Sequence, residues 1–203
     1  MIKNFKMKTR LFLILFILIS PLYSFSQTWS EQELEKANTC ILIDDLSEIE
    51  KEAILYINLA RLFPLKFEKI EVLTYFGPEK YGAYLEDSPY KESLSSDLKT
   101  IKPMNALIYN EELRELAICF ALEQGASGYM GHDRKKCEGF YNAECIAYDM
   151  ETGKDIAMQL LVDHEVPSLG HRQACLDSEL TKVGIGFSTH KKASFCAVLD
   201  FLN

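Results

Sequence analysis

The chain has 203 residues, of which 48% are hydrophobic and 26% charged, and its formal charge at pH 7 is -8. This composition excludes a disordered or fibrous chain, and the excess of acidic groups repels the phosphate backbone of nucleic acids. We therefore expect a globular protein that does not bind nucleic acid.

The first 26 residues have the pattern of an export signal. Four basic residues precede the apolar run 11–19, and Ser24 and Ser26 occupy the small-residue positions of a cleavage site. The alternative is an uncleaved anchor helix, but this run is far shorter than the roughly 20 residues that cross a bilayer. We expect a signal peptide over residues 1–26, cleaved near Ser26/Gln27, and a secreted or periplasmic protein with no transmembrane helix in the mature chain.

Removal of the signal peptide makes the chain more acidic, because residues 1–26 carry four positive charges and no negative one. The remainder has the size of one compact domain, which at this length is stable without oligomerisation. We expect a monomer with a polar lead-in over residues 27–45 and a folded domain over residues 46–203.

The first strong helix signal starts at Ser47. Ser47 and Glu50 have the spacing of a capping box, and apolar residues then recur at helical intervals until Pro64 ends the run. Asn58 and Arg61 fall on the polar side of this helix, where we expect them to tie it to its neighbours.

Three further segments follow before the middle of the chain. Residues 65–76 could form a second helix, residues 77–89 are predicted to be a loop, and residues 90–101 a further helix. A stronger helix is indicated by apolar residues at i, i+3, i+4, i+7 and i+8, namely Leu113, Leu116, Ala117, Phe120 and Ala121. We expect it to end near Gly125.

The second half of the chain mixes strands with one more helix. An irregular segment, 131–140, precedes a short strand over 142–148 and a helix that Thr152 caps, which runs to about Asp163. Alternating residues from Val183 onward and the strand-like run 194–201 predict a C-terminal β-hairpin. The order of elements favours an α+β layered domain over a parallel nucleotide-binding sheet.

The six cysteines could form disulfides that stabilise this fold, because an exported protein meets an oxidising compartment. Six cysteines allow 15 full pairings, and the sequence does not choose among them. We expect at least one disulfide but not three, and a buried free thiol is an equal alternative for the residue in the apolar helix. The cysteines are Cys40, Cys119, Cys137, Cys145, Cys175 and Cys196.

Two histidines and two acids stand out as candidate site residues. His132 and His171 each follow a glycine, and Glu144 and Asp163 lie between them in the sequence. Two neutral imidazoles with two carboxylates could hold zinc or another divalent cation, or form a hydrogen-bonded network without metal. The alternative is that both histidines lie at the surface or at helix ends.

Short motifs around these residues resemble the SCP domain of the CAP superfamily, which groups cysteine-rich secretory proteins, antigen 5 and plant pathogenesis-related proteins. The resemblance covers roughly residues 47–203. The motifs appear in the order Asn58-Leu59-Ala60-Arg61, Gly131-His132, Ala143-Glu144, the run from Val166 to Arg172, the run from Val183 to Phe187, and Leu199-Asp200-Phe201.

This resemblance implies a three-layer α-β-α sandwich with a small, mostly antiparallel sheet. It also implies a cleft where two histidines and two acids converge and often hold a divalent metal. His132, Glu144 and His171 match the family motifs, and Asp163 matches the second acid, for which Glu165 is a competitor. Two residues depart from the family pattern: Cys145 stands in place of Asn and Leu160 in place of Trp.

Three functions fit these residues. The favoured one is a non-enzymatic binding module for a small apolar ligand, a peptide or an envelope component. The alternative is a zinc-dependent hydrolase in which His132 and His171 hold the metal and Glu144 is the general base. A nucleophile pair of Cys145 with His132 or His171 needs an activated thiol, which export disfavours.

Three other polar residues fit simpler roles. We expect His164, after the helix, and His190, in the hairpin turn, to be exposed. Arg172 could pair with an acidic ligand group or form a helix-end salt bridge with Asp177 or Glu179.

Overall fold

The computed structural model describes residues 28–203. The predicted signal peptide and its cleavage site lie outside these residues. Among the helices of residues 28–203, none has the length and apolar composition needed to cross a bilayer.

A four-stranded sheet lies at the centre of the molecule. Its strands are β1 (Ile108–Tyr109), β2 (Ala143–Tyr148), β3 (Lys182–His190) and β4 (Ser194–Leu202), in the spatial order β1-β3-β4-β2. Only the short β1–β3 pair is parallel, and β4 pairs antiparallel with both β3 and β2. The predicted C-terminal hairpin and the strand before it are confirmed.

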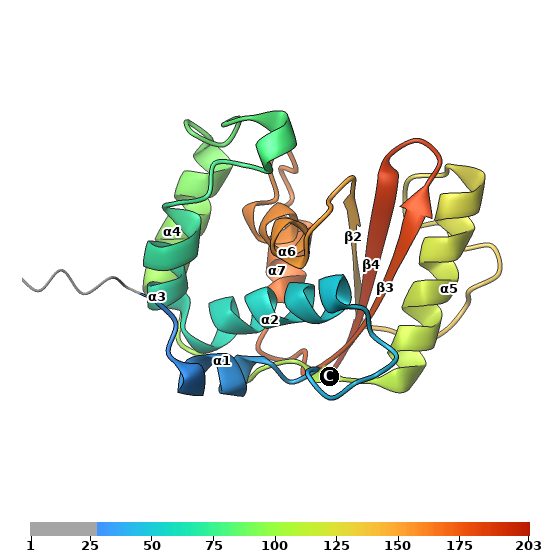
Figure 1. The fold of residues 1–203 in the computed structure, drawn as a ribbon, viewed down its shortest axis with the longest axis horizontal. Helices are drawn as coiled ribbons and strands as arrows, with labels where there is room; N and C mark the ends of the chain where they lie inside the picture. The colour runs from blue at the N-terminus through green and yellow to red at the C-terminus, as the bar shows by residue number, and fades with distance from the viewer. Residues whose placement is uncertain (1–27) are drawn as a thin grey trace, which may run out of the picture.

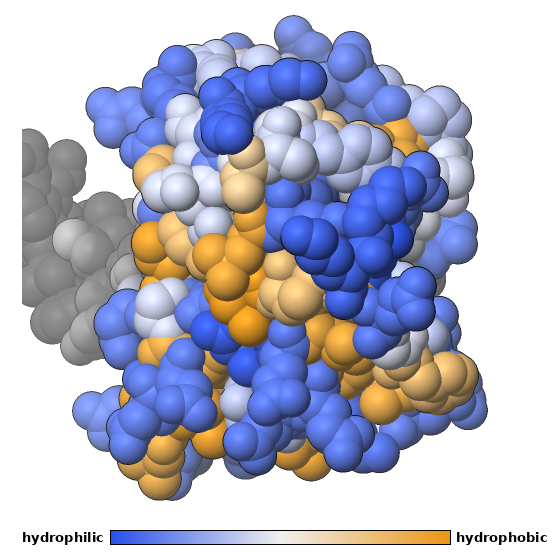
Figure 2. All heavy atoms as spheres, turned by 90° about the vertical axis from the view of Figure 1, so that its right-hand side faces the viewer, coloured by the Kyte–Doolittle hydropathy of each residue, from blue (hydrophilic) through white to orange (hydrophobic). Residues whose placement is uncertain are grey.

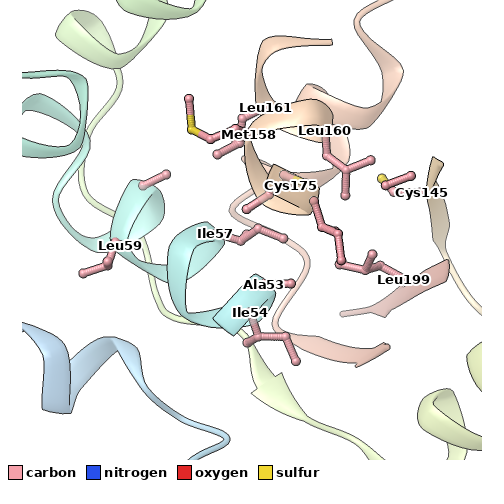
Figure 3. Packing of buried hydrophobic residues seen from close by; sticks show 14 of the residues in the cluster. Ala53, Ile54, Ile57, Leu59, Cys145, Met158, Leu160, Leu161, Cys175 and Leu199 are labelled. Atoms are coloured by element: carbon pink, nitrogen blue, oxygen red, sulfur yellow. The ribbon is translucent and has the colours of Figure 1, made fainter. Parts of the chain in front are cut away.

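Helices cover both faces of this sheet. On one side α5 (Glu111–Ser127) packs against β3 and β4, and on the other side lie α2 (Glu48–Leu62), α6 (Gly153–Val162) and α7 (Gly170–Cys175), as Figure 1 shows. Side chains of α2 and α6 point into a common core, together with Leu199 of β4 (Figure 3). The predicted α-β-α sandwich is confirmed.

Helix α2 begins and ends where the sequence predicts. The Ser47–Glu50 capping box forms, and the helix stops at Leu62, before Pro64. Asn58 and Arg61 are fully buried rather than on a polar surface. They tolerate burial because they bond backbone groups of distant segments, so they do tie the helix to its neighbours.

The bonds of these two residues hold α2 to three other segments. The Asn58 amide donates to the carbonyls of Ala37 and Leu107 and accepts from the Leu107 N–H. The Arg61 guanidinium donates to four backbone carbonyls, those of Asn105, Cys175, Asp177 and Leu180.

The end of α5 differs from the prediction. The helix passes through Gly125 and ends at Ser127, followed by Gly128 in the left-handed conformation with φ 73°. A Cβ on Gly125 would lie 2.1 Å from the Thr189 carbonyl oxygen. Gly125 is therefore a point of close helix–strand contact, and Gly128 is the residue that ends the helix.

The lead-in contains a helix that the sequence analysis did not predict. Helix α1 (Glu31–Ala37) has its own capping box between Ser30 and Glu33, and Ala37 at its end is buried. The helix packs against α2. Its apolar face is too short to give a clear periodicity, which is why the signal was missed.

The segments between α2 and β2 largely follow the predictions. The second helix is divided into α3 (Pro64–Phe67) and a π-helical turn over Glu68–Val72, and the loop after it contains a short 3-10 turn over Glu79–Tyr81. Helix α4 spans Pro89–Thr100.

One disulfide joins α5 to the segment before β2. Cys119 and Cys137 are bonded, with their Cα atoms 5.6 Å apart. The expectation of at least one disulfide is confirmed, and Cys119 is not a free thiol. The other four cysteines are buried and unbonded.

The outer face of α5 is mostly hydrophilic. Figure 2 shows this side of the molecule, with patches of apolar surface between hydrophilic residues. Leu122 and Phe140 are 56% and 74% exposed. Scattered exposed apolar residues of this kind are usual on soluble domains.

Candidate functional site

Two histidine–carboxylate pairs meet beside β2: one belongs to β2 and the loop before it, and the other to the end of α6 and the start of α7. His132 Nδ1 lies 2.5 Å from Glu144 Oε1, and His171 Nδ1 lies 2.7 Å from Asp163 Oδ1. The two imidazole rings face each other with centroids 6.5 Å apart and an angle of 26° between their planes. The structure therefore brings together all four residues that the sequence analysis selected.

The two imidazole rings are more exposed to solvent than the two carboxylates, which lie behind them in the interior. The His132 and His171 side chains are 58% and 23% exposed, whereas those of Glu144 and Asp163 are 4% and 1% exposed. A carboxylate that faces Nδ1 favours the tautomer with a proton on that nitrogen, which leaves Nε2 as the free acceptor of a neutral ring. Neither Nε2 atom has a hydrogen-bond partner within residues 28–203.

Asp163 holds His171 through the backbone as well as through the ring. It ends α6 in the left-handed conformation with φ 54°, so that its side chain turns back toward the start of α7. There Oδ2 accepts the N–H groups of His171 and Arg172, in a helix whose own N-cap residue provides no side-chain cap. Glu165, the competing acid, is exposed. The geometry selects Asp163.

Arg134 is a site residue that the sequence analysis missed. Its Nε donates to Glu144 Oε2 at 2.8 Å, and its Nη2 donates to Glu144 Oε2 and, at 2.5 Å, to Asp200 Oδ1. The guanidinium also lies over the rings of Phe120 and Tyr141. This arrangement fixes the Glu144 carboxylate, which in turn fixes the His132 ring.

Arg134 could be recognised only from contacts between segments that are distant in the sequence, and not from a local sequence pattern. Glu144 and Asp200 are direct partners in the β2–β4 pairing, so two carboxylates lie side by side and require a cation between them. Burial raises the pKa of Asp200 to about 6, although Arg134 acts in the opposite direction.

The paired imidazoles line a hollow of about 400 Å³. Its remaining walls are aromatic and aliphatic, with few polar atoms. Besides the rings and Asp163 they comprise Tyr84, Gly131, Ile146, Tyr148, Gln159, Leu160, Val162, His164 and Val166. A concave site of this size, apolar with a few fixed polar groups, can hold part of a small molecule or a side chain of a peptide.

The other two histidines are not exposed as expected. His190 is buried: Nε2 contacts the Tyr129 carbonyl at 2.9 Å, and Nδ1 accepts the N–H groups of Lys192 and Ala193. This ring therefore shapes the hairpin turn. His164 is half-buried beside the hollow, bonded to Ser88 Oγ at 2.9 Å.

Arg172 has neither of its expected partners. Its guanidinium is buried between α4, α6 and α7, where it donates to the carbonyls of Tyr90, Leu161 and Val162. It also forms an ion pair with Asp97 at 2.9 Å. Asp177 and Glu179 are not involved, because Arg172 points into the interior and anchors the helix that carries His171.

Cys145 is not placed as a nucleophile. Its side chain is fully buried, and its Sγ donates to the His171 backbone carbonyl at 3.7 Å rather than to a ring. Contact with the Cys175 thiol, together with burial, raises the pKa of Cys145 well above its ordinary value. This is the opposite of the activation that a catalytic thiol needs.

The side chains that could act as metal ligands limit the kind of metal site that is possible. Within the described residues, no three His, Cys, Asp or Glu side chains are arranged so that they could hold one ion. The two free Nε2 atoms are therefore the available ligands, and the carboxylates stand behind them as supporting groups. Zinc sites use three or four ligands, so an ion here would need water or a bound molecule to complete its coordination.

Comparison with known proteins agrees with this architecture. The model of the cysteine-rich secretory protein family, CAP, matches residues 58–201. This match spans more than half of the chain, and the chain belongs to the CAP family. The resemblance noted in the sequence is confirmed.

Comparisons with solved structures and with curated proteins give weaker evidence of similarity. A 1.5 Å crystal structure of an extracellular protein containing a SCP domain, from Bacillus anthracis str. Ames, is similar at 15% identity and a TM-score of 0.35. The match covers 55% of this chain and 38% of that one. No curated protein matches the chain.

Proposed function

We propose that this CAP-family chain is an exported binding module whose hollow captures a small apolar ligand, a peptide or an envelope component. One observation carries this proposal: two facing imidazoles, one exposed and one half-buried, line a largely apolar hollow, and their supporting carboxylates are already occupied. Such rings can bind a ligand through Nε2 without reorganising. Export rests on the predicted signal peptide over residues 1–26.

The arrangement favours binding over turnover because Glu144 has no free oxygen for proton transfer. Oε1 is engaged by His132 and Oε2 by Arg134. A general base must reach the proton that it removes, and a carboxylate fixed by two donors is poorly placed to do so. Among the described residues that line the hollow there is also no Ser, Thr or Cys to act as a nucleophile.

A divalent metal fits this proposal as a partner of the ligand. His132 and His171 would hold it through Nε2, with Glu144 and Asp163 behind them, as carboxylates commonly support metal-binding histidines. When bound, such an ion would supply a Lewis acid for donor groups of the ligand. The chain's own residues hold the imidazoles at the required tautomer and orientation.

The zinc-dependent hydrolase remains the second candidate, because carboxylate–histidine pairs also support the metal ion of zinc enzymes. To separate the two, the full chain is purified without chelators and its zinc content measured. Peptide and ester turnover is then compared between the wild type and Glu144→Gln. We expect at most one ion per chain and no turnover in either protein.

His171→Asn and His164→Asn form the matched pair for this experiment. Both histidines border the hollow, but only His171 belongs to the facing pair. We expect His171→Asn to lower zinc affinity at least tenfold and His164→Asn to leave it nearly unchanged. Hydrolysis that requires Glu144 and stoichiometric zinc would discard the binding module in favour of the enzyme.

A further inference from the structure

Two unbonded cysteines lie beneath the site, on the elements that carry it. Cys145 follows Glu144 in β2, and Cys175 is the last residue of α7, four positions after His171. Both side chains are fully buried in the same core cluster (Figure 3).

The Cys145 thiol lies against α7, the helix that carries Cys175. Cys145 Sγ contacts the carbonyl oxygen of His171 at 3.7 Å. A helical carbonyl at position i points along the axis toward residue i+4, which here is Cys175. Helix α7 and strand β2, which carry the two cysteines, pack against each other.

We infer that Cys145 and Cys175 form a second disulfide when the chain folds in an oxidising compartment. The sulfur–sulfur bond forms as the two thiols lose two protons and two electrons. A low-molecular-weight disulfide such as glutathione disulfide accepts them and leaves as two thiols. Because the folded thiols are buried, this exchange takes place during folding rather than in the finished domain.

This bond would join β2 to α7. It would link the strand of Glu144 to the helix of His171, and so bind the two histidine–carboxylate pairs into one rigid unit. The inference is independent of the proposed binding function, since it requires only the two thiols and an oxidant.

The test is a peptide map of the full chain after reduction, denaturation and refolding with reduced and oxidised glutathione. Remaining thiols are alkylated in denaturant, and trypsin is added without reductant. Cleavage after Lys and Arg gives peptide 115–134 with Cys119, peptide 137–154 with Cys137 and Cys145, and peptide 173–182 with Cys175. We expect one species that contains all three peptides, and alkylation only of Cys40 and Cys196.

Two variants control the assignment. In Cys145→Ser, peptide 173–182 should be released and Cys175 alkylated, whereas in Cys196→Ser, another buried free thiol, the three peptides should stay joined. A wild-type map in which 115–134 and 137–154 are joined while Cys175 is fully alkylated would overturn the inference. This outcome is read on the wild type, so it does not depend on either variant folding.

Discussion

Asp200 shows how a single buried residue couples the site to pH. It shares Arg134 with Glu144, and its second oxygen, Oδ2, is buried with no partner within residues 28–203. Burial raises the pKa of the Asp200 carboxyl from its ordinary value of 3.8 to about 6 in the folded protein. A carboxyl whose pKa is raised on folding stabilises the fold below its unfolded pKa, and this contribution is lost as the pH rises through the folded pKa.

We therefore expect Asp200→Asn to gain stability relative to the wild type as the pH rises from 4 to 7. The gain should be on the order of 3 kcal/mol, from the difference between the two pKa values. Urea unfolding of both proteins at several pH values measures it, with Asp133→Asn, a change at an exposed aspartate, as control. A constant difference between Asp200→Asn and the wild type over this range would contradict the assignment.

The residues of the site differ in how far the sequence could predict them. His132, Glu144, Asp163 and His171 were selected because they stand in short motifs of recognisable spacing. Arg134 and His190 were not understood, because their partners are Asp200 and Tyr129, more than 60 positions away. A local pattern carries no information about such partners, whereas strand pairing does.

At the scale of elements, the contact between α5 and the sheet depends on the glycines of β3. A Cβ on Gly184 would lie 2.1 Å from the Arg114 nitrogen, and one on Gly186 would lie 2.3 Å from the Ile118 nitrogen. Both glycines lie in the first strand of the predicted C-terminal hairpin, and the structure confirms this strand. Their role is to let the helix approach the strand closely.

Gly186→Ala should destabilise the domain by about 1–3 kcal/mol, since backbone atoms of α5 occupy the space that the methyl group needs. Thr189→Ala, at an exposed position of the same strand, should change stability by no more than about 0.5 kcal/mol. Denaturant unfolding of both variants tests this. Wild-type stability of Gly186→Ala would mean that α5 can move away from β3 at little cost.

Elements were predicted well where their signals are local. Helices α2 and α6 have their capping residues and apolar periodicity within a few positions, and both begin at the expected residue. The predicted end of α5 was wrong. Gly125 resembles a glycine that ends a helix, but it instead allows the helix to approach Thr189 of β3 closely. The two residues of β1 and the six residues of α7 are too few to produce a periodic pattern.

For the whole molecule, the Cys119–Cys137 disulfide restrains the segment that carries His132 and Arg134. The two cysteines are 18 positions apart, and closing a loop of this length lowers the entropy of the unfolded chain enough to stabilise the fold by about 3 kcal/mol. The double change Cys119→Ser with Cys137→Ser should lower the free energy of unfolding by about that amount.

Urea unfolding with and without reductant checks this expectation. The double variant keeps the bond inferred between Cys145 and Cys175, so reductant should lower the stability of both proteins, and it should remove the difference between them. If the double variant were as stable as the oxidised wild type, the restraint would contribute nothing to folding.

The position of β4 has a consequence for the order in which the domain can assemble. This strand follows the other three strands in the sequence, yet it lies inside the sheet, with β3 bonded to one of its edges and β2 to the other. Synthesis proceeds from the amino end, so a nascent polypeptide still short of Ser194 lacks the piece that unites the halves of the sheet. Such a polypeptide cannot complete the sheet, so β2 and β3 are joined only once β4 has been made.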